Sequence, residues 1–455
     1  MTSFTSNLCM TDDSDTTVYA DYAAFARAVY ETGVLSDPWL DGNERFGLRG
    51  VVLPARRAHA LAEAAERVAY VHQELVHILI ENPSLLEEFY RLTPWQRAMW
   101  AASGGLWHGM ARADLFICDD GRIACCELNS DTPSGQPEAV ILNRMLYAAH
   151  RGTGDGGLHD PNANMCARYI EMLRQSHEKN APDAATAAAR TLSTVGIIYP
   201  TELSEDLAMI TLFTRWLESA GIAVVGGSPF NLRRTSRGLE VLGVPVDLVV
   251  RHYKTDWWGE RVPVWNDAAS YPDPEPLDRP LGALLSAEAS GEVTVVNPFG
   301  SVVTQNKLSL AFFWEEQKRF SRRARNWIRK YIPETYRMER VGAARLLAER
   351  ESWVLKSDYG CEGEETICGA FVNEDIWRRT VEQACPEHFV AQRFFHVRPD
   401  ESGRLANYGV YLLGGSAAGF FTRLSPQGTG YAAVTVPTYI ARGRQQQQQQ
   451  QQQAI

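Results

Sequence analysis

The chain of 455 residues lacks the patterns that mark several common classes of protein. It has no uninterrupted apolar run of about 18 residues, which a membrane-spanning helix needs. Its first residues, 1–19, are polar and acidic, with no basic segment followed by an apolar one, so a secretory signal peptide is not predicted. These absences predict a cytoplasmic protein with no membrane partner.

Cysteine motifs and an excess of positive charge are also missing. The chain has 8 cysteines but no C-x-x-C pair, which argues against a disulfide framework, a zinc site or a redox centre. Buried thiols are the favoured interpretation, including for the adjacent Cys125 and Cys126. Lys and Arg number 45 against 55 Asp and Glu, for a formal net charge of −10. We therefore expect small-molecule partners and no nucleic acid.

Several catalytic signatures are absent as well. The sequence contains no G-x-x-x-x-G-K-[ST], H-E-x-x-H or G-x-S-x-G. Residues 152–157 satisfy G-x-G-x-x-G, but they follow a helical stretch, 140–149, where a dinucleotide-binding fold needs a strand. We interpret this segment as a linker. His252 and His396 lie in strand-like runs and are interpreted as structural histidines.

The patterns that are present indicate more than one domain, since about 150 residues per domain is usual. An amphipathic helix is predicted over residues 56–89, from apolar residues at three- and four-residue steps. Residues 195–300 alternate between strand and helix patterns, which predicts a small Rossmann-like α/β unit. Its expected strands are 195–199, 222–225, 246–253 and 293–297, with a helix from Ser204 to Gly221.

Two further segments stand out by composition. A helix predicted over residues 313–331 carries clustered Arg and Lys, which we interpret as a solvated face, with a phosphate or polyanion site as the alternative. Residues 445–453 are consecutive glutamines. This low-complexity tail is expected to be disordered and to take no part in the mechanism.

The chemically informative segment is a predicted β-hairpin around Asp120-Gly121. A two-residue turn there places Asp114 opposite Glu127 and Arg112 opposite Asn129, with all four side chains on one face. Carboxylates directly opposite one another are destabilising unless something neutralises them. Oxygen ligands from Asp, Glu and Asn suit Mg²⁺, and Arg112 could hold a phosphate oxygen. The alternative is an edge hairpin whose acids sit in solvent and pair with arginine.

The residues that follow this hairpin carry a family resemblance. The segment Glu127-Leu-Asn-Ser-Asp-Thr-Pro-Ser-Gly135 resembles the acidic motif of the glutathionylspermidine synthase family, which are ATP-grasp ligases with that motif early in the chain. Similar segments follow the family order over nearly all of residues 19–440. They are Asp37-Pro-Trp-Leu40, Arg251-His-Tyr-Lys-Thr-Asp-Trp-Trp258, Val295-Val-Asn-Pro298, Gln305-Asn-Lys307 to Trp314, Trp353-Val-Leu-Lys356, Gly360-Cys-Glu-Gly363, Phe389-Val-Ala-Gln392 and Phe421-Thr-Arg423 to Pro437.

The resemblance implies a mixed α/β (α+β) ATP-grasp fold with a Rossmann-like subdomain and a mobile lid. Residues 15–188 would form the first part of the core, with a helical region and the acidic hairpin. Residues 189–300 would form the Rossmann-like subdomain, 301–440 the lid and nucleotide-binding core, and 441–455 a disordered tail. No amino-terminal amidase domain is expected, because too few residues precede the synthetase-like region.

The resemblance also implies roles for individual residues. The expected Mg²⁺ ligands are Asp114, Glu127 and Asn129. The residues expected to bind ATP are Lys307, Lys356, Gly360, Gly363 and Gln392, and the residues expected to steady the transferred phosphoryl group are Arg112 and Arg423. The structural alternatives are an exposed helix lysine for Lys307, a strand-end lysine for Lys356, an ordinary turn for the two glycines, a backbone-bonded strand residue for Gln392 and a surface ion pair for Arg423.

The implied activity is ATP- and Mg²⁺-dependent joining of a small-molecule carboxylate, from a peptide or amino acid, to an amine through an acyl phosphate, with release of ADP and phosphate. Two positions depart from the family. Cys361 stands where its lid loop has arginine, and Gly135 where glutathione-using members have cysteine, so glutathione is not assigned as the substrate. The alternatives are a peptide or amino-acid ligase of a specialised biosynthetic pathway, a nucleotide-binding regulatory or scaffold protein without turnover, and a structural α/β protein with an accidental resemblance.

Overall fold

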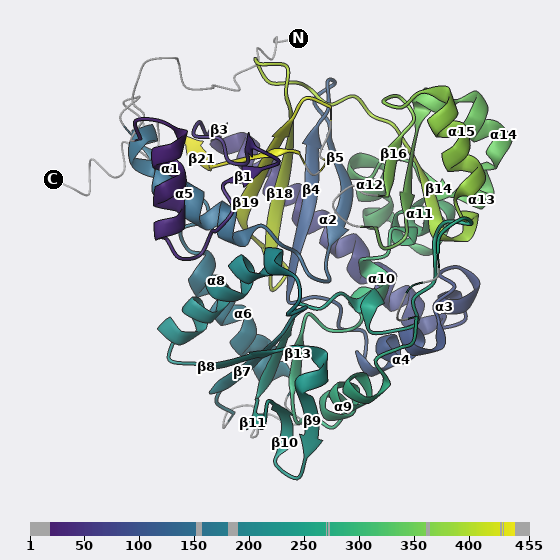
Figure 1. Cartoon of the computed structure of the whole chain (residues 1–455). Helices are drawn as coiled ribbons and strands as arrows, with labels where there is room; N and C mark the ends of the chain where they lie inside the picture. The colour runs from purple at the N-terminus through teal and green to yellow at the C-terminus, as the bar shows by residue number, and fades with distance from the viewer. Residues whose placement is uncertain are drawn as a thin grey trace.

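The computed structural model describes residues 19–151, 157–180, 190–269, 271, 274–360, 365–427, 430 and 432–441. The poly-Gln tail, Cys361, Gly363 and most of the glycine segment 152–157 lie outside these residues. Within them the protein is mixed α/β, as predicted. Its largest sheets have five, four and four strands (Figure 1).

The five-stranded sheet, called here the central sheet, joins an early part of the chain to a late one. Its order is β20-β19-β18-β4-β5, and all pairings are antiparallel. Because β4 pairs with β18, side chains far apart in the sequence lie side by side. The strands are β4 (Met110–Ile117), β5 (Ile123–Asn129), β18 (Leu405–Leu413), β19 (Ser416–Ser425) and β20 (Val434–Val436).

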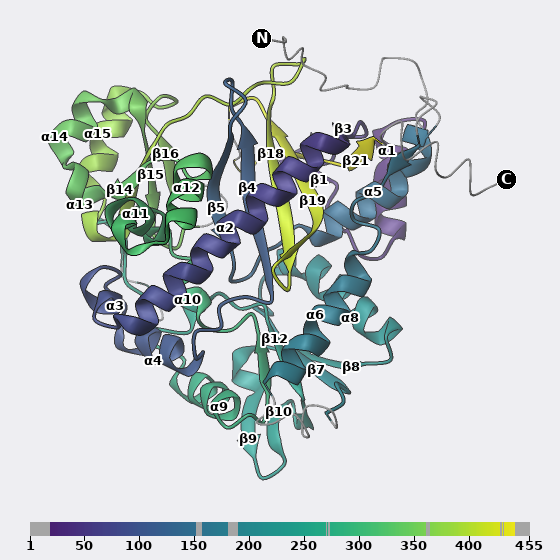
Figure 2. The same ribbon diagram turned by 180° about the vertical axis from the view of Figure 1, so that it is seen from behind.

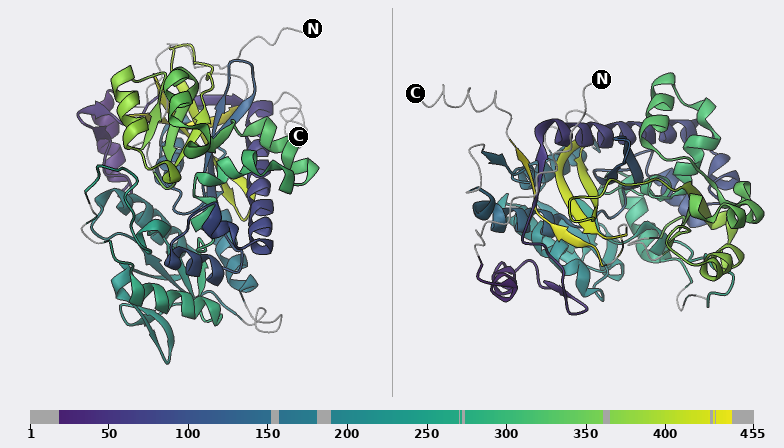
Figure 3. Two further views of the ribbon diagram at one scale, coloured as in Figure 1. Left: turned by 90° about the vertical axis from the view of Figure 1, so that its right-hand side faces the viewer. Right: turned by 90° about the horizontal axis from the view of Figure 1, so that it is seen from above.

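A long helix, α2 (Ala55–Glu81), runs across one face of the central sheet (Figures 2 and 3). Its apolar stripe packs in one hydrophobic cluster with alternate residues of β4 and β18. The predicted helix over 56–89 is therefore too long, since α2 ends at Glu81 and a short helix, α3 (Leu85–Glu88), follows. Pro83 explains the break, because a residue before proline disfavours the helical conformation, and Asn82 has φ −133° and ψ 66°.

A four-stranded parallel sheet forms the α/β unit predicted over residues 195–300. Its order is β13-β12-β7-β8. All four predicted strands are confirmed, as is the helix between the first two. The elements are β7 (Thr194–Ile198), η1 (Ser204–Asp206), α8 (Leu207–Ser219), β8 (Ala223–Gly227), β12 (Leu248–Arg251), α9 (Asp278–Ala289) and β13 (Thr294–Val296), with a small antiparallel sheet of β9 (Leu232–Thr235), β10 (Gly238–Val241) and β11 (Val244–Pro245) inserted after β8.

The second four-stranded sheet, called here the flanking sheet, has the order β14-β17-β15-β16 and antiparallel pairings. One of its faces packs against three helices in a cluster that contains Trp353 and Trp377. Its other face meets the core around α2. The elements are β14 (Thr335–Arg337), α13 (Met338–Val341), α14 (Ala343–Ala348), β15 (Trp353–Ser357), β16 (Thr366–Cys368), α15 (Glu374–Gln383) and β17 (Phe389–Arg393).

The basic segment forms two helices rather than the single one predicted over 313–331. α11 (Leu308–Glu315) is followed by the short η4 (Gln317–Arg319) and then by α12 (Arg322–Tyr331). Ser321 begins the second helix, because its Oγ accepts a hydrogen bond from the N–H of Ala324 at 3.1 Å. The basic side chains of α12 are largely exposed while its apolar side packs on α2, as a solvated face requires.

The remaining helices lie around these sheets. They are α1 (Tyr22–Glu31), α4 (Pro94–Ala102), α5 (Gln136–Arg151), α6 (Met165–Lys179) and α10 (Ser301–Thr304). Three of the short strands form a sheet of β3 (Val51–Pro54), β21 (Thr438–Ala441) and β6 (Leu158–His159). None of the described helices combines the length and apolar character that crossing a bilayer requires.

Candidate active site

The hairpin of β4 and β5 has the predicted pairing but a different turn. Asp114 lies opposite Glu127 and Arg112 opposite Asn129. The connection has three residues rather than two, since the N–H of Cys118 donates to the carbonyl of Arg122 at 2.9 Å and Gly121 has φ 85°. A glycine in the left-handed region is usual in three-residue hairpin loops. This loop alone would move the pairing by one residue.

A β-bulge at Cys126 restores the pairing. Leu115 pairs with Cys125 and Asp114 with Glu127, so β5 has one residue more than β4 between the two pairs. Bulges of this kind re-aim side chains and are frequent beside active sites. The carbonyl oxygen of Cys126 also accepts a hydrogen bond from Lys356 Nζ at 3.1 Å. The bulge thus returns Glu127 to the face of Asp114 and gives a lysine of the flanking sheet an acceptor.

Asp114 is bonded to both predicted catalytic arginines. Arg112 Nε lies 2.7 Å from Asp114 Oδ1 and its terminal nitrogen 3.1 Å from Oδ2, while Arg423 donates to Oδ2 at 2.8 Å. Asp114 is only 1% exposed. Burial raises the pKa of its carboxyl, but the charges of Arg112 and Arg423 outweigh burial and hold that pKa below its ordinary value. Two guanidinium groups therefore compensate the charge of this carboxylate in the structure, and its predicted role as a Mg²⁺ ligand stays a prediction.

An aromatic ring and two glycines shape the space around these arginines. The Phe421 ring centroid lies 5.4 Å from Arg112 and 5.3 Å from Arg423, within range of cation–π attraction. Gly409, opposite Asp114 on β18, leaves room for Arg112, because a Cβ there would lie 2.8 Å from Arg112 Cδ. Gly135 has φ 91°, and a Cβ there would lie 2.8 Å from the Phe421 ring.

Glu127 and its neighbour Cys126 each contact one of the two predicted nucleotide lysines. Lys307 Nζ is 3.7 Å from Glu127 Oε2 and donates to the carbonyl of Gly360, and the backbone N–H of Lys307 donates to the carbonyl of Asp358 at 2.8 Å. Lys307 is 4% exposed and Lys356 5%, so the alternative of an exposed helix lysine is wrong for Lys307. The fold thus brings Lys307, Lys356, Gly360 and Glu127 together from three separate segments.

Gln392 lies on the same face of the flanking sheet as Lys356. Lys356 pairs with Val390 across β15 and β17, and side chains two residues apart on a strand share a face. The Gln392 side chain is buried and donates to Thr335 Oγ1 at 3.0 Å. It is therefore bonded to a neighbouring side chain rather than to the backbone.

The donors around Glu127 fit Mg²⁺ by their chemistry. Asn129 Nδ2 donates to Glu127 Oε1 at 3.4 Å, and the Glu127 side chain is 28% exposed, so a cation from solvent can reach these oxygens. Oxygen donors without sulfur or imidazole suit Mg²⁺. Among the described residues no group of three or more His, Cys, Asp and Glu side chains is arranged to hold a metal ion. The buried Nε of Arg423 has no partner within the described part of the chain, which leaves it a donor for an anion.

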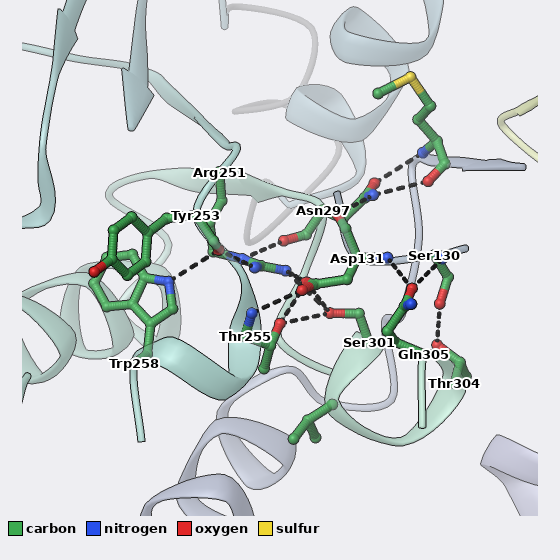
Figure 4. A network of polar contacts seen from close by, with 12 residues as sticks. Ser130, Asp131, Arg251, Tyr253, Thr255, Trp258, Asn297, Ser301, Thr304 and Gln305 are labelled. Atoms are coloured by element: carbon green, nitrogen blue, oxygen red, sulfur yellow. Dashed lines mark hydrogen bonds and ion pairs between the residues drawn. The ribbon is translucent and has the colours of Figure 1, made fainter. Parts of the chain in front are cut away.

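A buried network fixes the end of β5 to the parallel sheet (Figure 4). Arg251, at the end of β12, donates to Asp131 Oδ1 at 2.5 Å, and the N–H of Thr255 donates to Asp131 Oδ2 at 2.7 Å. Ser301 Oγ donates to the same carboxylate at 2.9 Å. Burial raises the pKa of Asp131, but the Arg251 charge and these hydrogen bonds lower it overall. Sequence reasoning assigned these residues no role, although Asp131 and Arg251 lie in two of the matched segments with opposite charges.

Two amide side chains extend the network to both strands of the hairpin (Figure 4). Asn297 Oδ1 accepts from the N–H groups of Gly109 and Met110, both at 2.8 Å, and Asn297 Nδ2 donates to the carbonyls of Met110 and Asp131. Gln305 Oε1 accepts from the N–H of Ser130 at 2.9 Å. The start of β4 and the residues just after β5 are thus held against β13 and α10, which positions the polar face between them.

Comparison with known proteins adds a likeness of fold. No protein-family model matches the chain, and no curated protein matches it in sequence. The apo structure of a glutathione synthetase-like effector from Globodera pallida is similar with a TM-score of 0.56 and 13% identity, over 91% of this chain and 95% of that one. This likeness shows a common fold, and the mixed α/β class with an ATP-grasp-like architecture agrees with it.

Two other solved structures are similar more weakly. A gamma-glutamylcysteine synthetase-like protein from Methylobacillus flagellatus has a TM-score of 0.40 and 15% identity, over 79% of this chain and 82% of that one. D-alanyl-alanine synthetase A from Vibrio cholerae has a TM-score of 0.32 and 12% identity, over 58% and 80%. None of these three structures is described as a glutathionylspermidine synthase.

Proposed function

We propose that the chain is an ATP- and Mg²⁺-dependent ligase that joins a carboxylate to an amine and releases ADP and phosphate. The observation that carries the proposal is the gathering of four cations, Arg112, Arg423, Lys307 and Lys356, around Asp114 and Glu127. These six side chains leave an excess of positive charge in a chain whose net charge is −10. A triphosphate is the kind of ligand that such a local excess fits.

In this proposal the two lysines bind the phosphates of ATP. Lys307 and Lys356 already lie beside Glu127 and the bulge carbonyl, and Gly360 is the last described residue before the predicted lid loop. Magnesium bound with the nucleotide would neutralise phosphate charge, held by Glu127 and Asn129, with Asp114 as the third expected ligand. Asp114 would join them once one of its arginines transfers a hydrogen bond to the nucleotide.

The arginines act on the reacting group. A substrate carboxylate oxygen attacks the γ-phosphorus and ADP leaves. The amine nitrogen then attacks the carbonyl carbon of the acyl phosphate, displaces inorganic phosphate and loses a proton to give the amide. Arg112 and Arg423 stabilise the charge that spreads over the transferred phosphoryl oxygens, and the buried Nε of Arg423 supplies a donor that no described residue uses. Asp114 and the Phe421 ring hold both guanidinium groups in place. No side-chain nucleophile is needed.

The finer proposal is a glutathionylspermidine synthase-like ligase that acts on a peptide or amino-acid carboxylate. It rests on the matched segments and on the fold shared with an effector described as glutathione synthetase-like. The packing of Gly135 against Phe421 leaves no space for the family's cysteine at that position, so glutathione itself is not proposed. A ligase of a specialised biosynthetic pathway is the nearest alternative.

A second candidate is a protein that binds nucleotide without turnover. The bonds from Arg112 and Arg423 to Asp114 favour it, because they occupy groups that the reaction needs. The two candidates differ in whether substrates release phosphate, since a protein without turnover binds ATP but forms no product.

The deciding experiment measures Mg²⁺- and ATP-dependent phosphate release with pooled carboxylic acids and small peptides crossed against pooled amines. The native chain is compared with Glu127→Gln and with the control Glu351→Gln, whose side chain is 76% exposed. Release that needs both pools and is lost only in Glu127→Gln supports the ligase. Nucleotide binding without release supports the second candidate, and no nucleotide binding rejects both.

A further inference from the structure

A pocket of about 140 Å³ lies on the face of the flanking sheet that points away from Lys356. It is lined by Glu334, Tyr336, Arg340, Val341, Arg345 and Arg393. Most of these residues come from β14, β17, α13 and α14, and Glu334 directly precedes β14. β14, α13 and α14 lie together in Figure 1, and β17 pairs with β14. Tyr336 and Arg393 directly follow Thr335 and Gln392, so the two pairs point to opposite faces of the sheet. The pocket is therefore distinct from the candidate active site.

Three arginines meet at this pocket with most of their hydrogen-bond donors unused. Arg340 donates to Glu315 at 3.3 Å, Arg345 to Glu349 at 3.0 Å and Arg393 to Glu349 at 3.1 Å. Each arginine thus donates one side-chain hydrogen bond to the residues that the structure describes. A guanidinium group has five N–H donors, so most of them are not used by these residues. Their side chains are 55%, 50% and 31% exposed, so a solute can reach them.

Glu349 and Trp353 hold Arg345 and Arg393 side by side, and Arg340 lines the same pocket from α13. Arg345 and Arg393 lie over the Trp353 ring, at 5.5 and 4.0 Å from its centroid. Burial and Glu334 raise the pKa of Tyr336, while the charges of all three arginines lower it, which places its phenol within their combined field. In the described part of the chain the Tyr336 hydroxyl has no hydrogen-bond partner, so it adds a further donor to the pocket.

We propose that this pocket binds a compact oxyanion, either inorganic phosphate or the phosphate group of a small monoester. Guanidinium forks match the oxygens of phosphate, and three arginines that line one pocket with a hydroxyl donor suit its tetrahedral arrangement better than a planar carboxylate. The volume leaves room for a small organic group beside the phosphate, and Glu334, which also lines the pocket, can accept a hydrogen bond from that group. This proposal does not depend on the chain being a ligase.

The test is calorimetric titration of the full chain with inorganic phosphate, glycerol 3-phosphate and succinate at constant ionic strength. The variants Arg340→Gln/Arg345→Gln and Arg340→Lys/Arg345→Lys are compared with native protein. Lys356→Met removes the competing phosphate site expected beside β5. The double variant Arg322→Gln/Arg329→Gln controls for general loss of charge, because both arginines are exposed on α12.

We expect the pocket to bind one phosphate with equal affinity in native protein, Lys356→Met and the α12 variant, while any second phosphate bound beside β5 in native protein is lost in Lys356→Met. The glutamine variant should bind at least about ten-fold more weakly, and the lysine variant should recover part of the affinity. Should the double variant fold poorly, Arg340→Gln alone suffices, because its described ionic partner is Glu315. The proposal is overturned if native protein does not bind phosphate, if the glutamine variant binds like native, if Lys356→Met abolishes binding, or if succinate binds more tightly than phosphate.

Discussion

Arg112 and Asp114 form a two-point ion pair between neighbours on the same face of one strand, with contacts of 2.7 and 3.1 Å. Residues two positions apart on a strand share a face, so their spacing alone brings them together. Arg423, from a strand near the end of the chain, completes the cluster at 2.8 Å. Asp114 therefore has a structural role that does not depend on the proposed activity.

The first prediction concerns the stability that Asp114 provides. Asp114→Asn keeps the shape of the side chain but removes the buried negative charge that Arg112 and Arg423 contact. We expect unfolding by urea to show a loss of about 3–5 kcal/mol, the usual cost of breaking a buried pair. Asp120→Asn, at the exposed hairpin turn, should cost much less, because exposed ion pairs contribute little to stability. Equal losses in the two variants would contradict this role.

The second prediction concerns Gly135 and Phe421. Gly135→Ala introduces a Cβ 2.8 Å from the Phe421 ring, and it places alanine at φ 91°. Gly403→Ala is the matched control, since Gly403 has φ 77° but nothing within 4 Å of an added Cβ. Both variants should lose about 1 kcal/mol from backbone strain, and Gly135→Ala should lose about 1–3 kcal/mol more. Thermal unfolding of both measures the difference, and equal losses would show that the ring moves aside freely.

The third prediction concerns the acid sensitivity of two buried histidines. Burial lowers the pKa of His72 to about 4 and the pKa of His108 to about 4, from 6.5. Between these values the unfolded chain binds more protons at these two sites than the folded chain does, so they lower the free energy of unfolding as pH drops below about 6.5. Burial also raises the pKa of Asp256 to about 7 and of Glu288 to about 8, and these two carboxyls act in the opposite direction over the same range.

Urea unfolding of native protein and variants at pH 7.5, 6 and 5 isolates the histidine contribution. His108→Phe should become more stable relative to native protein as pH falls, because the His108 ring packs 3.8 Å from Trp107 and its Nδ1 has no partner among the described residues. His59→Gln, on the exposed side of α2, should keep the pH dependence of native protein. A His108→Phe curve parallel to the native curve from pH 7.5 to 5 would contradict the prediction.

The fourth prediction concerns Arg423 and depends on the proposed ligase activity. Arg423→Lys keeps the charge but loses the planar fork that can contact Asp114 and a phosphoryl oxygen together. Phosphate release at saturating substrate should fall roughly 10- to 100-fold, with a much smaller change in ATP affinity. Equal losses in turnover and ATP affinity would indicate that Arg423 binds the ground state rather than the reacting group.

Several elements followed from the sequence because their causes are local. Alternating patterns located the four parallel strands around Val195 and Val295, and the Asp-Gly signal located the hairpin. The order of the segments that resemble the ligase family predicted that Lys307, Lys356 and Arg423 share one site, although they are far apart along the chain. The break in the basic helix was not predicted, because a single serine is a weak signal of a helix start when helix-forming residues surround it.

The sequence by itself determined the element types, the hairpin and the residue types of the candidate site, since these depend on spacing along the chain and on side-chain chemistry. Only the tertiary structure decided that the bulge at Cys126 offsets the one-residue shift in strand pairing that the longer hairpin turn causes. It also decided that Arg112 and Arg423 pair with Asp114 and that Arg251 pairs with Asp131. These outcomes depend on which distant strands become neighbours. A buried charge is costly unless it is paired, and the folded sheet determines which oppositely charged side chain lies near enough to pair with it.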